Sequence, residues 1–158
     1  MLKRITIKDW RLTFTCAKIA KVVGVNSHVN GDLHIAMWDF DHVPLEQVQR
    51  VLLNTQVTFA LPTIYIAKTS EPDNYIAYCF CLRHFKEICQ IVMATPYVCW
   101  NFLKFGIYRG RFTLRVGAKA GKEITHASIL NSPILPSCCP NDLKSWVQYE
   151  TLAQKGGL

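Results

Sequence analysis

The sequence predicts a single α+β domain with an RRM-like, mostly antiparallel sheet and helices packed on one face. Half of the 158 residues are hydrophobic, which is enough for one substantial core but leaves no room for two. Runs of β-forming residues alternate with segments of helical period. Two such runs, 63–68 and 75–81, flank a short turn with Pro, Asp and Asn, which predicts an antiparallel hairpin. We expect this domain to span residues 1–158.

Before the hairpin, the chain predicts two strands and one helix. Alternating β-formers over 5–14 indicate a strand. The segment 22–31 contains Gly, Asn and Ser, which favour a loop. Residues 33–41 predict a buried strand that ends in acidic residues. An amphipathic helix follows over 44–54, because Pro44 suits a first helical position.

After the hairpin, apolar residues return to helical spacing. This spacing predicts a helix over 83–94 and a second helix over 97–105, closed by Gly106. Residues 111–116 alternate polar and apolar side chains, which indicates a strand. The proline-rich tail is expected to be irregular until a final helix over 141–152, capped by Asn and Asp.

The charge pattern indicates a polyanionic partner. Lys and Arg total 18 against 11 Asp and Glu, a net charge of +7. The span from Lys104 to Lys122 contains basic residues and no acidic ones, and such a surface attracts phosphate-bearing molecules. No uninterrupted run of apolar residues is long enough to span a membrane, so no membrane partner is expected.

Seven scattered cysteines favour a reducing, cytoplasmic location over a secreted disulfide framework. Cys79 and Cys81 alternate with apolar residues, which indicates small buried side chains in a strand. The alternative is a zinc site that combines them with Cys138 and Cys139.

The most informative motif is Trp38-Asp39-Phe40-Asp41 at the end of the strand 33–41. Residues two apart on a strand project from one face, so Asp39 and Asp41 are expected to lie close together. Two such carboxylates repel unless a cation lies between them, and Mg²⁺ or Mn²⁺ prefers oxygen ligands. The alternative is a pair of solvent-facing aspartates at a helix start.

This arrangement resembles the catalytic half of the archaeo-eukaryotic primase and primase-polymerase superfamily. The segments that carry the resemblance are 37–41 for the family's metal-binding D-x-D, 68–75 for its phosphate-binding hairpin, and 115–119 for the basic strand that follows. The likeness covers about residues 33–122.

The resemblance implies metal-dependent nucleotidyl transfer in DNA replication, as primer synthesis or primer extension. Asp39 and Asp41 would be the catalytic pair that holds Mg²⁺ or Mn²⁺. The implied substrates are nucleoside triphosphates and a single-stranded DNA template, and the implied partner is a helicase or another replication protein. Small domains of this kind are typical of phages and plasmids.

The resemblance also assigns phosphate contacts. Where the family places a histidine, after the aromatic residue of the hairpin, this chain has Ile76. The residues expected to bind the nucleotide are Lys68, Ser70, His126, Arg111 and Arg115, the two arginines through planar donor forks on one strand face. Those expected to bind the nucleic-acid backbone are Arg109, Lys119 and Lys122.

Two other functions remain open. A rolling-circle replication initiator would use Tyr65 of the pattern Tyr65-x-x-Lys68 as nucleophile and His34 as metal ligand. A non-catalytic module would bind single-stranded nucleic acid through aromatics interleaved with cations from Trp100 to Phe112. The helical spacing of those aromatics predicts that most belong to the core.

Overall fold

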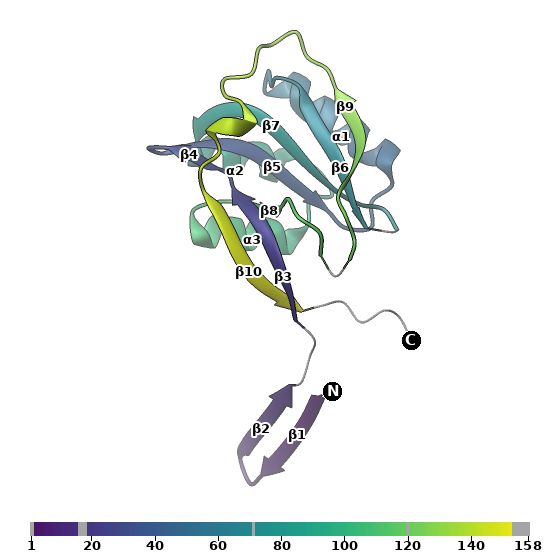
Figure 1. Cartoon of the computed structure of the whole chain (residues 1–158), viewed down its shortest axis with the longest axis vertical. Helices are drawn as coiled ribbons and strands as arrows, with labels where there is room; N and C mark the ends of the chain where they lie inside the picture. The colour runs from purple at the N-terminus through teal and green to yellow at the C-terminus, as the bar shows by residue number, and fades with distance from the viewer. Residues whose placement is uncertain (1, 16–18, 71, 120, 153–158) are drawn as a thin grey trace.

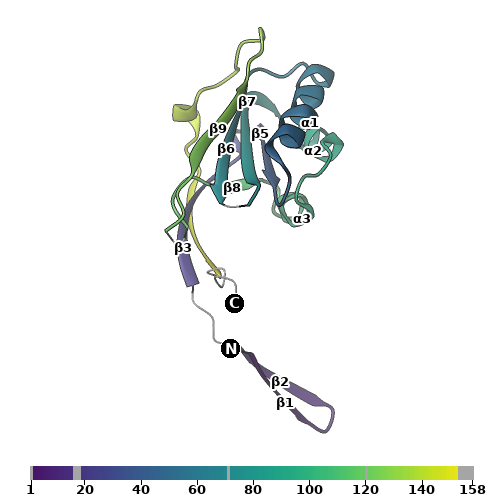
Figure 2. The same ribbon diagram turned by 90° about the vertical axis from the view of Figure 1, so that its right-hand side faces the viewer.

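A five-stranded antiparallel sheet and the helices on one side of it form the body of the protein (Figures 1 and 2). The computed structural model describes residues 2–15, 19–70, 72–119 and 121–152. The sheet has the order β4-β5-β7-β6-β9, with β4 (His28–Asn30), β5 (Leu33–Phe40), β6 (Ile64–Ser70), β7 (Asn74–His84) and β9 (Thr125–Leu130). The helices are α1 (Leu45–Thr58), α2 (Phe85–Ala94) and α3 (Trp100–Arg109). The expected α+β class, RRM-like sheet and predicted hairpin are confirmed.

A second sheet has the order β10-β3-β8. Its strands are β3 (Ile19–Asn26), β8 (Thr113–Arg115) and β10 (Trp146–Leu152), and Figure 2 shows β3 and β10 on the side away from the helices. Two predictions were therefore wrong. Most of the expected loop 22–31 belongs to strands, and the expected final helix 141–152 is a short 3-10 turn, Pro140–Asp142, followed by β10.

The turn-type residues of β3 are explained by close contact among three strands. A Cβ on Gly24 would lie 2.9 Å from the Leu114 carbonyl oxygen and 2.9 Å from the Tyr149 ring. The Asn26 amide donates to the Ser145 hydroxyl at 2.7 Å and accepts from the Thr113 hydroxyl at 2.6 Å. Gly24 and Asn26 therefore allow the three strands to approach closely and do not form a turn.

The predicted strand 5–14 is a hairpin of two strands, β1 (Leu2–Ile7) and β2 (Trp10–Thr15). Lys8 turns the chain with a φ of +52°. Figure 1 draws this hairpin apart from the other two sheets, and Trp10 is 78% exposed.

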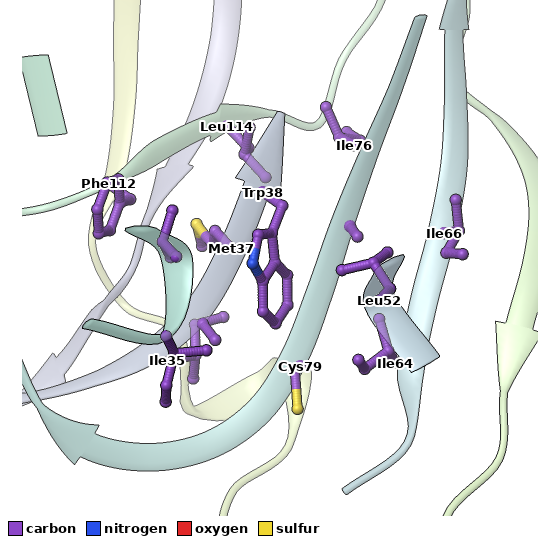
Figure 3. Close-up of a cluster of buried hydrophobic side chains, with 14 of the residues drawn as sticks. Ile35, Met37, Trp38, Leu52, Ile64, Ile66, Ile76, Cys79, Phe112 and Leu114 are labelled. Atoms are coloured by element: carbon purple, nitrogen blue, oxygen red, sulfur yellow. The ribbon is translucent and has the colours of Figure 1, made fainter. Parts of the chain in front are cut away.

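The core fixes the position of β5 against the helices. Trp38 is fully buried in the cluster of Figure 3, and burying a side chain of this size contributes roughly 3 kcal/mol or less. Its indole N–H donates to the Thr95 hydroxyl at 3.0 Å, and that hydroxyl donates to the Ile91 carbonyl at 2.9 Å. The end of α2 is therefore held against β5 just before the chain enters α3.

The ends of two helices, α3 and α1, differ from the predicted ones. Gly106 lies inside α3, where an added Cβ would collide with the Phe112 ring, and Gly110, with a φ of +67°, ends the helix instead. α1 extends beyond the expected residue 54, to Thr58. Within the part of the chain that the structure describes, no helix is long and apolar enough to cross a membrane.

Candidate metal and phosphate site

Asp39, Asp41 and Cys99 form a cluster at the carboxyl end of β5. One ligand atom from each lies within 4.8 Å of the others, which confirms the expected closeness of the two aspartates. Asp39 is the half-buried penultimate residue of β5, and Asp41 is exposed directly after the strand. The Cys99 backbone N–H donates to the Asp39 carbonyl oxygen at 2.8 Å, which fixes the start of α3 beside the pair.

Two strained backbone positions flank this cluster. His42 follows Asp41 with a φ of +58°, and Tyr97 precedes Cys99 by two residues with a φ of +66°. Non-glycine residues in this region cost about 1–2 kcal/mol and persist only where the surroundings enforce them. The His42 backbone N–H donates to the Asn74 side-chain oxygen at 3.2 Å, so the loop after Asp41 is anchored to the β6–β7 turn.

The electrostatics of the cluster disfavour a doubly ionised pair. Burial and the neighbouring Asp41 raise the pKa of Asp39 to about 7, although the positive charges of Arg115 and Lys119 act in the opposite direction. A bound divalent cation would relieve both effects, because it replaces lost hydration and neutralises the repulsion.

Cys99 is a thiol at neutral pH. Burial and a hydrogen bond to Asp41 raise its pKa to about 11. Carboxylate oxygens suit Mg²⁺ and Mn²⁺, whereas a thiolate suits softer metals. The donor set therefore fits a hard cation on the two aspartates, with Cys99 as a third ligand only for a softer metal.

Arg115 connects this cluster to a second feature. Its guanidinium donates to the carbonyl oxygens of Gly117 at 3.2 Å, of Lys122 at 3.1 Å and of Thr69. Its positive charge also lowers the pKa of Asp39. Arg115 thus connects Thr69 of β6 with Gly117 and Lys122 next to the carboxylates.

The second feature is an open cleft of about 250 Å³ between β6 and the segment before β9. It is lined by Lys68, Thr69, Ser70, Lys122, Glu123 and Thr125. Three of these, Lys68, Ser70 and Lys122, are among the phosphate-binding residues expected from the sequence. The cleft offers hydroxyl and ammonium groups, which suit an anionic ligand.

Arg111 does not share a strand face with Arg115, so that expectation was wrong. Strand β8 contains only Thr113–Arg115. Arg111 precedes it and is exposed, and its backbone N–H donates to the Gly106 carbonyl at the end of α3. The reason is the length of α3, which continues to Arg109 and leaves Arg111 in the connection.

His126 lies far from the carboxylates. Asp39 pairs with Ile76, Ile76 with Ala67, and Ala67 with His126. At about 4.8 Å per strand, three strand spacings separate His126 from Asp39 by about 14 Å. His126 follows Thr125 and so adjoins the cleft, where a phosphate contact remains a prediction.

Ile76 is the direct cross-strand partner of Asp39. It is 2% exposed. Its side chain therefore forms an apolar wall next to Asp39. This wall is one source of the desolvation of Asp39.

The geometry disfavours the rolling-circle alternative. His34 pairs with Arg83 and Tyr65 with Tyr78 on the shared neighbour β7, so they lie five residues, or about 17 Å, apart along the strand. The Tyr65 ring packs edge-on against Phe80 at 5.8 Å, which is a packing role.

The sulfurs of the zinc alternative do not meet the spacing of a metal site, although Cys138 lies near enough to Cys79 and Cys81 for their charges to interact. Within the described ranges, the only three His, Cys, Asp or Glu residues with ligand atoms within 4.8 Å of one another are Asp39, Asp41 and Cys99. Cys79 and Cys81 are buried in β7, as their apolar neighbours predicted.

Sequence reasoning missed Cys99 as a member of the site. No spacing connects it to the D-x-D, because it lies 58 residues beyond Asp41, and only the docking of α3 brings it there. The expectation that most aromatic residues from Trp100 to Phe112 belong to the core was also wrong, because Trp100, Phe105 and Tyr108 of α3 are exposed. Phe112, which follows α3, is in the core as expected.

In comparisons with known proteins, no protein-family model, curated protein or solved structure matches the chain.

Proposed function

We propose that this domain is a metal-dependent nucleotidyltransferase of the primase-polymerase type, which makes or extends a primer on single-stranded DNA. One observation supports this most strongly. The carboxylate pair, of which Asp39 is desolvated, and the basic cleft adjoin the same residue, Arg115, as a metal site and a phosphate site must when both act on one triphosphate.

Asp39 and Asp41 would hold Mg²⁺ or Mn²⁺ through carboxylate oxygens. When bound, such a metal lowers the pKa of an attacking 3′-hydroxyl and neutralises charge on the triphosphate. The protein itself positions the carboxylate. The hydrogen bond from the Cys99 backbone N–H to the Asp39 carbonyl oxygen fixes the backbone of Asp39, and the Ile76 side chain excludes water from one side of it.

The cleft would bind the phosphates of the incoming nucleotide. Lys68 and Lys122 supply positive charge, and the Ser70 hydroxyl supplies a donor, all on its lining. Arg115 sets the width of this cleft, because its guanidinium bonds the backbone of both walls. Lys119 lies close enough to Asp39 for its charge to act there. Nucleoside triphosphates are the proposed substrates, and a helicase or another phage or plasmid replication protein is the proposed partner.

The test is nucleotide incorporation on single-stranded and primed DNA templates with Mg²⁺ and with Mn²⁺. The parent should make product, and the double variant Asp39→Asn, Asp41→Asn should lose it by about 100-fold or more, because removing metal ligands abolishes the charge stabilisation. Asp32→Asn, which changes an exposed aspartate just before the other end of β5, is the matched control and should retain activity.

Equal product from the parent and the double variant would refute the metal role of the pair. Absence of product from the parent on both templates, with both metals, would refute the proposed reaction. Binding of Mn²⁺ by the parent alone would then leave only a metal-binding function for the cluster.

A further inference from the structure

The outer face of α3 exposes large aromatic side chains. Tyr108 is 87% exposed, Trp100 69% and Phe105 48%. Water-exposed aromatic residues gathered on one short helix are unusual for a monomer and indicate a surface that binds something.

These side chains alternate with cations. Trp100, Lys104 and Tyr108 are spaced four residues apart, so they follow one another along a single stripe of the helix. Phe105 and Arg109 have the same spacing on the adjacent stripe, and the Arg109 guanidinium lies 5.5 Å from the centroid of the Phe105 ring. Each stripe therefore presents both a flat apolar ring and a positive charge.

The opposite side of α3 is firmly packed. Leu103 and Gly106 are buried, and the Phe102 ring stacks on Phe112 with centroids 5.0 Å apart. The exposed rings therefore stand on a fixed helix, which can present them to a ligand with little loss of conformational entropy.

The charge around this face selects the kind of ligand. No Asp or Glu occurs between Glu87 and Glu123, a span that contains six Lys and Arg residues. Lysine is depleted in the core of protein interfaces. Aromatic rings with interleaved cations and no acids match the stacking and phosphate contacts of single-stranded nucleic acid.

We propose that the outer face of α3, formed by Trp100, Lys104, Phe105, Tyr108 and Arg109, binds single-stranded nucleic acid. Bases stack on the three rings, and Lys104 and Arg109 contact the phosphates. Because α3 begins directly after Cys99, a bound strand would pass next to the carboxylate cluster. The binding itself requires neither metal nor nucleotide, so it does not depend on the proposed function.

The test is fluorescence anisotropy of a labelled 20-nucleotide oligothymidylate in the presence of EDTA, which removes metals and so isolates this surface from the carboxylate site. The double variant Trp100→Ala, Tyr108→Ala should bind about thirtyfold more weakly or worse, because each stacked base contributes about 1–3 kcal/mol. The conservative variant Trp100→Phe, Tyr108→Phe should retain most of the affinity, since its rings still stack.

Trp146→Ala is the matched control, because this tryptophan is also exposed, 56%, but lies on β10. It should change affinity by about twofold or less, as expected for a surface residue outside the site. Lys104→Gln should weaken binding and reduce its salt dependence, because one phosphate contact is lost.

Equal binding by the parent and the alanine double variant, with both folded by circular dichroism, would overturn the proposal. So would a change in oligomeric state in light scattering without a change in oligonucleotide affinity, since that would make α3 a contact between protein copies. The substituted residues are exposed, so the variants should fold.

Discussion

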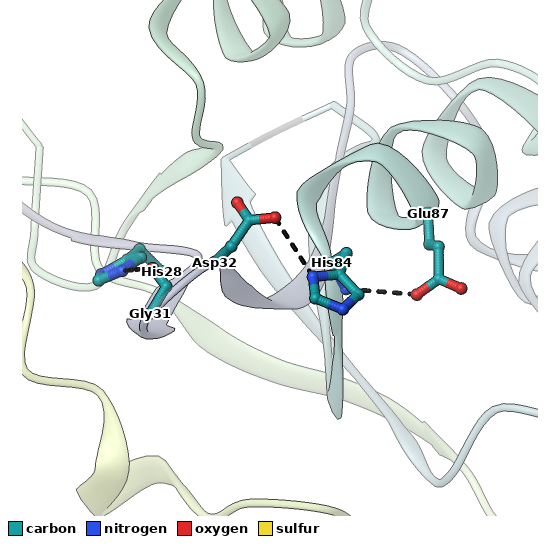
Figure 4. A network of polar contacts seen from close by, with 5 residues as sticks. All are labelled: His28, Gly31, Asp32, His84 and Glu87. Carbon is teal, nitrogen blue, oxygen red and sulfur yellow. Dashed lines mark hydrogen bonds and ion pairs between the residues drawn. The ribbon is translucent and has the colours of Figure 1, made fainter.

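Polar side chains cluster at both ends of the paired strands β5 and β7: around His84 at one end, the histidine end, and around Asp39 at the other, the carboxylate end. The two clusters differ in whether their polar groups have partners within the protein. At the histidine end, each group has a partner within the protein (Figure 4). The His84 ring contacts the Asp32 carboxylate at 3.2 Å, the His28 ring contacts the Gly31 carbonyl at 2.9 Å, and the His84 backbone N–H donates to Glu87 at 3.3 Å.

At the carboxylate end, the ionised form of Asp39 is only partly stabilised. Asp41 repels it and burial removes its water, and the positive charges of Arg115 and Lys119 oppose these two effects without cancelling them. The Cys99 thiol is already hydrogen-bonded to Asp41. A cluster whose members satisfy one another is structural, whereas a cluster with an unrelieved charge is suited to bind a ligand of opposite charge.

The two ends also respond to pH in opposite directions. Burial lowers the pKa of His34 to about 4, so acidification from pH 6.5 to 4 favours the unfolded state, which binds the proton more readily. The raised pKa of Asp39 has the reverse sign: the folded state binds the proton more tightly, and stability falls as pH rises from about 4 to 7.

Breaking the histidine end should have the largest effect on stability. The Ser27 hydroxyl bonds the His34 ring at 2.9 Å and accepts the Phe112 backbone N–H at 3.1 Å, both in the core. Ser27→Ala should lower the free energy of unfolding by about 3 kcal/mol, because two buried polar groups lose their partner. Urea denaturation measures this, with Ser137→Ala, at an exposed serine, as control. A loss below about 0.5 kcal/mol would show that water enters and replaces the hydroxyl.

Removing the charge of Asp39 should change the free energy of unfolding in the opposite direction, toward higher stability. Asp39→Asn should raise the unfolding free energy at pH 8 without metal by about 2 kcal/mol, because a desolvated charge is removed. At pH 4.5, where Asp39 is protonated, no gain is expected. The same denaturation at both pH values tests this, with the exposed Asp9→Asn as control. Destabilisation at pH 8 would mean that the charge of Asp39 is compensated within the protein.

The same variant should uncover the pH response of His34. In the parent, the two opposing dependences offset each other between pH 4 and 6.5. In Asp39→Asn, stability should therefore rise steadily with pH over that range. If the stability of the variant did not change with pH over this range, His34 would not be the group that opposes the pH dependence of Asp39.

Removing the thiol should sharpen the metal preference of the carboxylate end. Cys99→Ala should change the stabilisation by Mg²⁺ by about twofold or less, but weaken apparent Cd²⁺ affinity by about tenfold, because only a soft metal uses the sulfur. Thermal shifts at increasing metal concentration measure both. Cys89→Ala, at a half-buried cysteine of α2, is the control. A tenfold loss for Mg²⁺ would make Cys99 necessary for the geometry of the aspartates.

The smallest effect should come from the exposed pair at the histidine end. Asp32→Asn should change the unfolding free energy by about 0.5 kcal/mol or less, because His84 and Asp32 are both mostly exposed and water screens their attraction. Denaturation in low and high salt checks this. A larger, salt-sensitive loss would show that the pair supports the histidine end after all.

The sequence by itself determined what depends on local periodicity and neighbouring residues. The buried strand that ends in Asp39 and Asp41, the helix after it, and the β6–β7 hairpin could all be predicted, because spacing of two or of 3.6 residues records which face is buried. The closeness of the two aspartates followed from that same local geometry.

Only the tertiary structure decided what depends on partners distant in the chain. β3 and β10 pair although more than 100 residues separate them in the chain. Without knowledge of these strand partners, Gly24 and Asn26 indicate a turn. Cys99 reaches Asp39 only because α3 docks beside β5. Trp100 and Tyr108 are exposed because a different side of α3 packs on Phe112. Since α3 has apolar residues on all sides, its sequence does not show which side is buried.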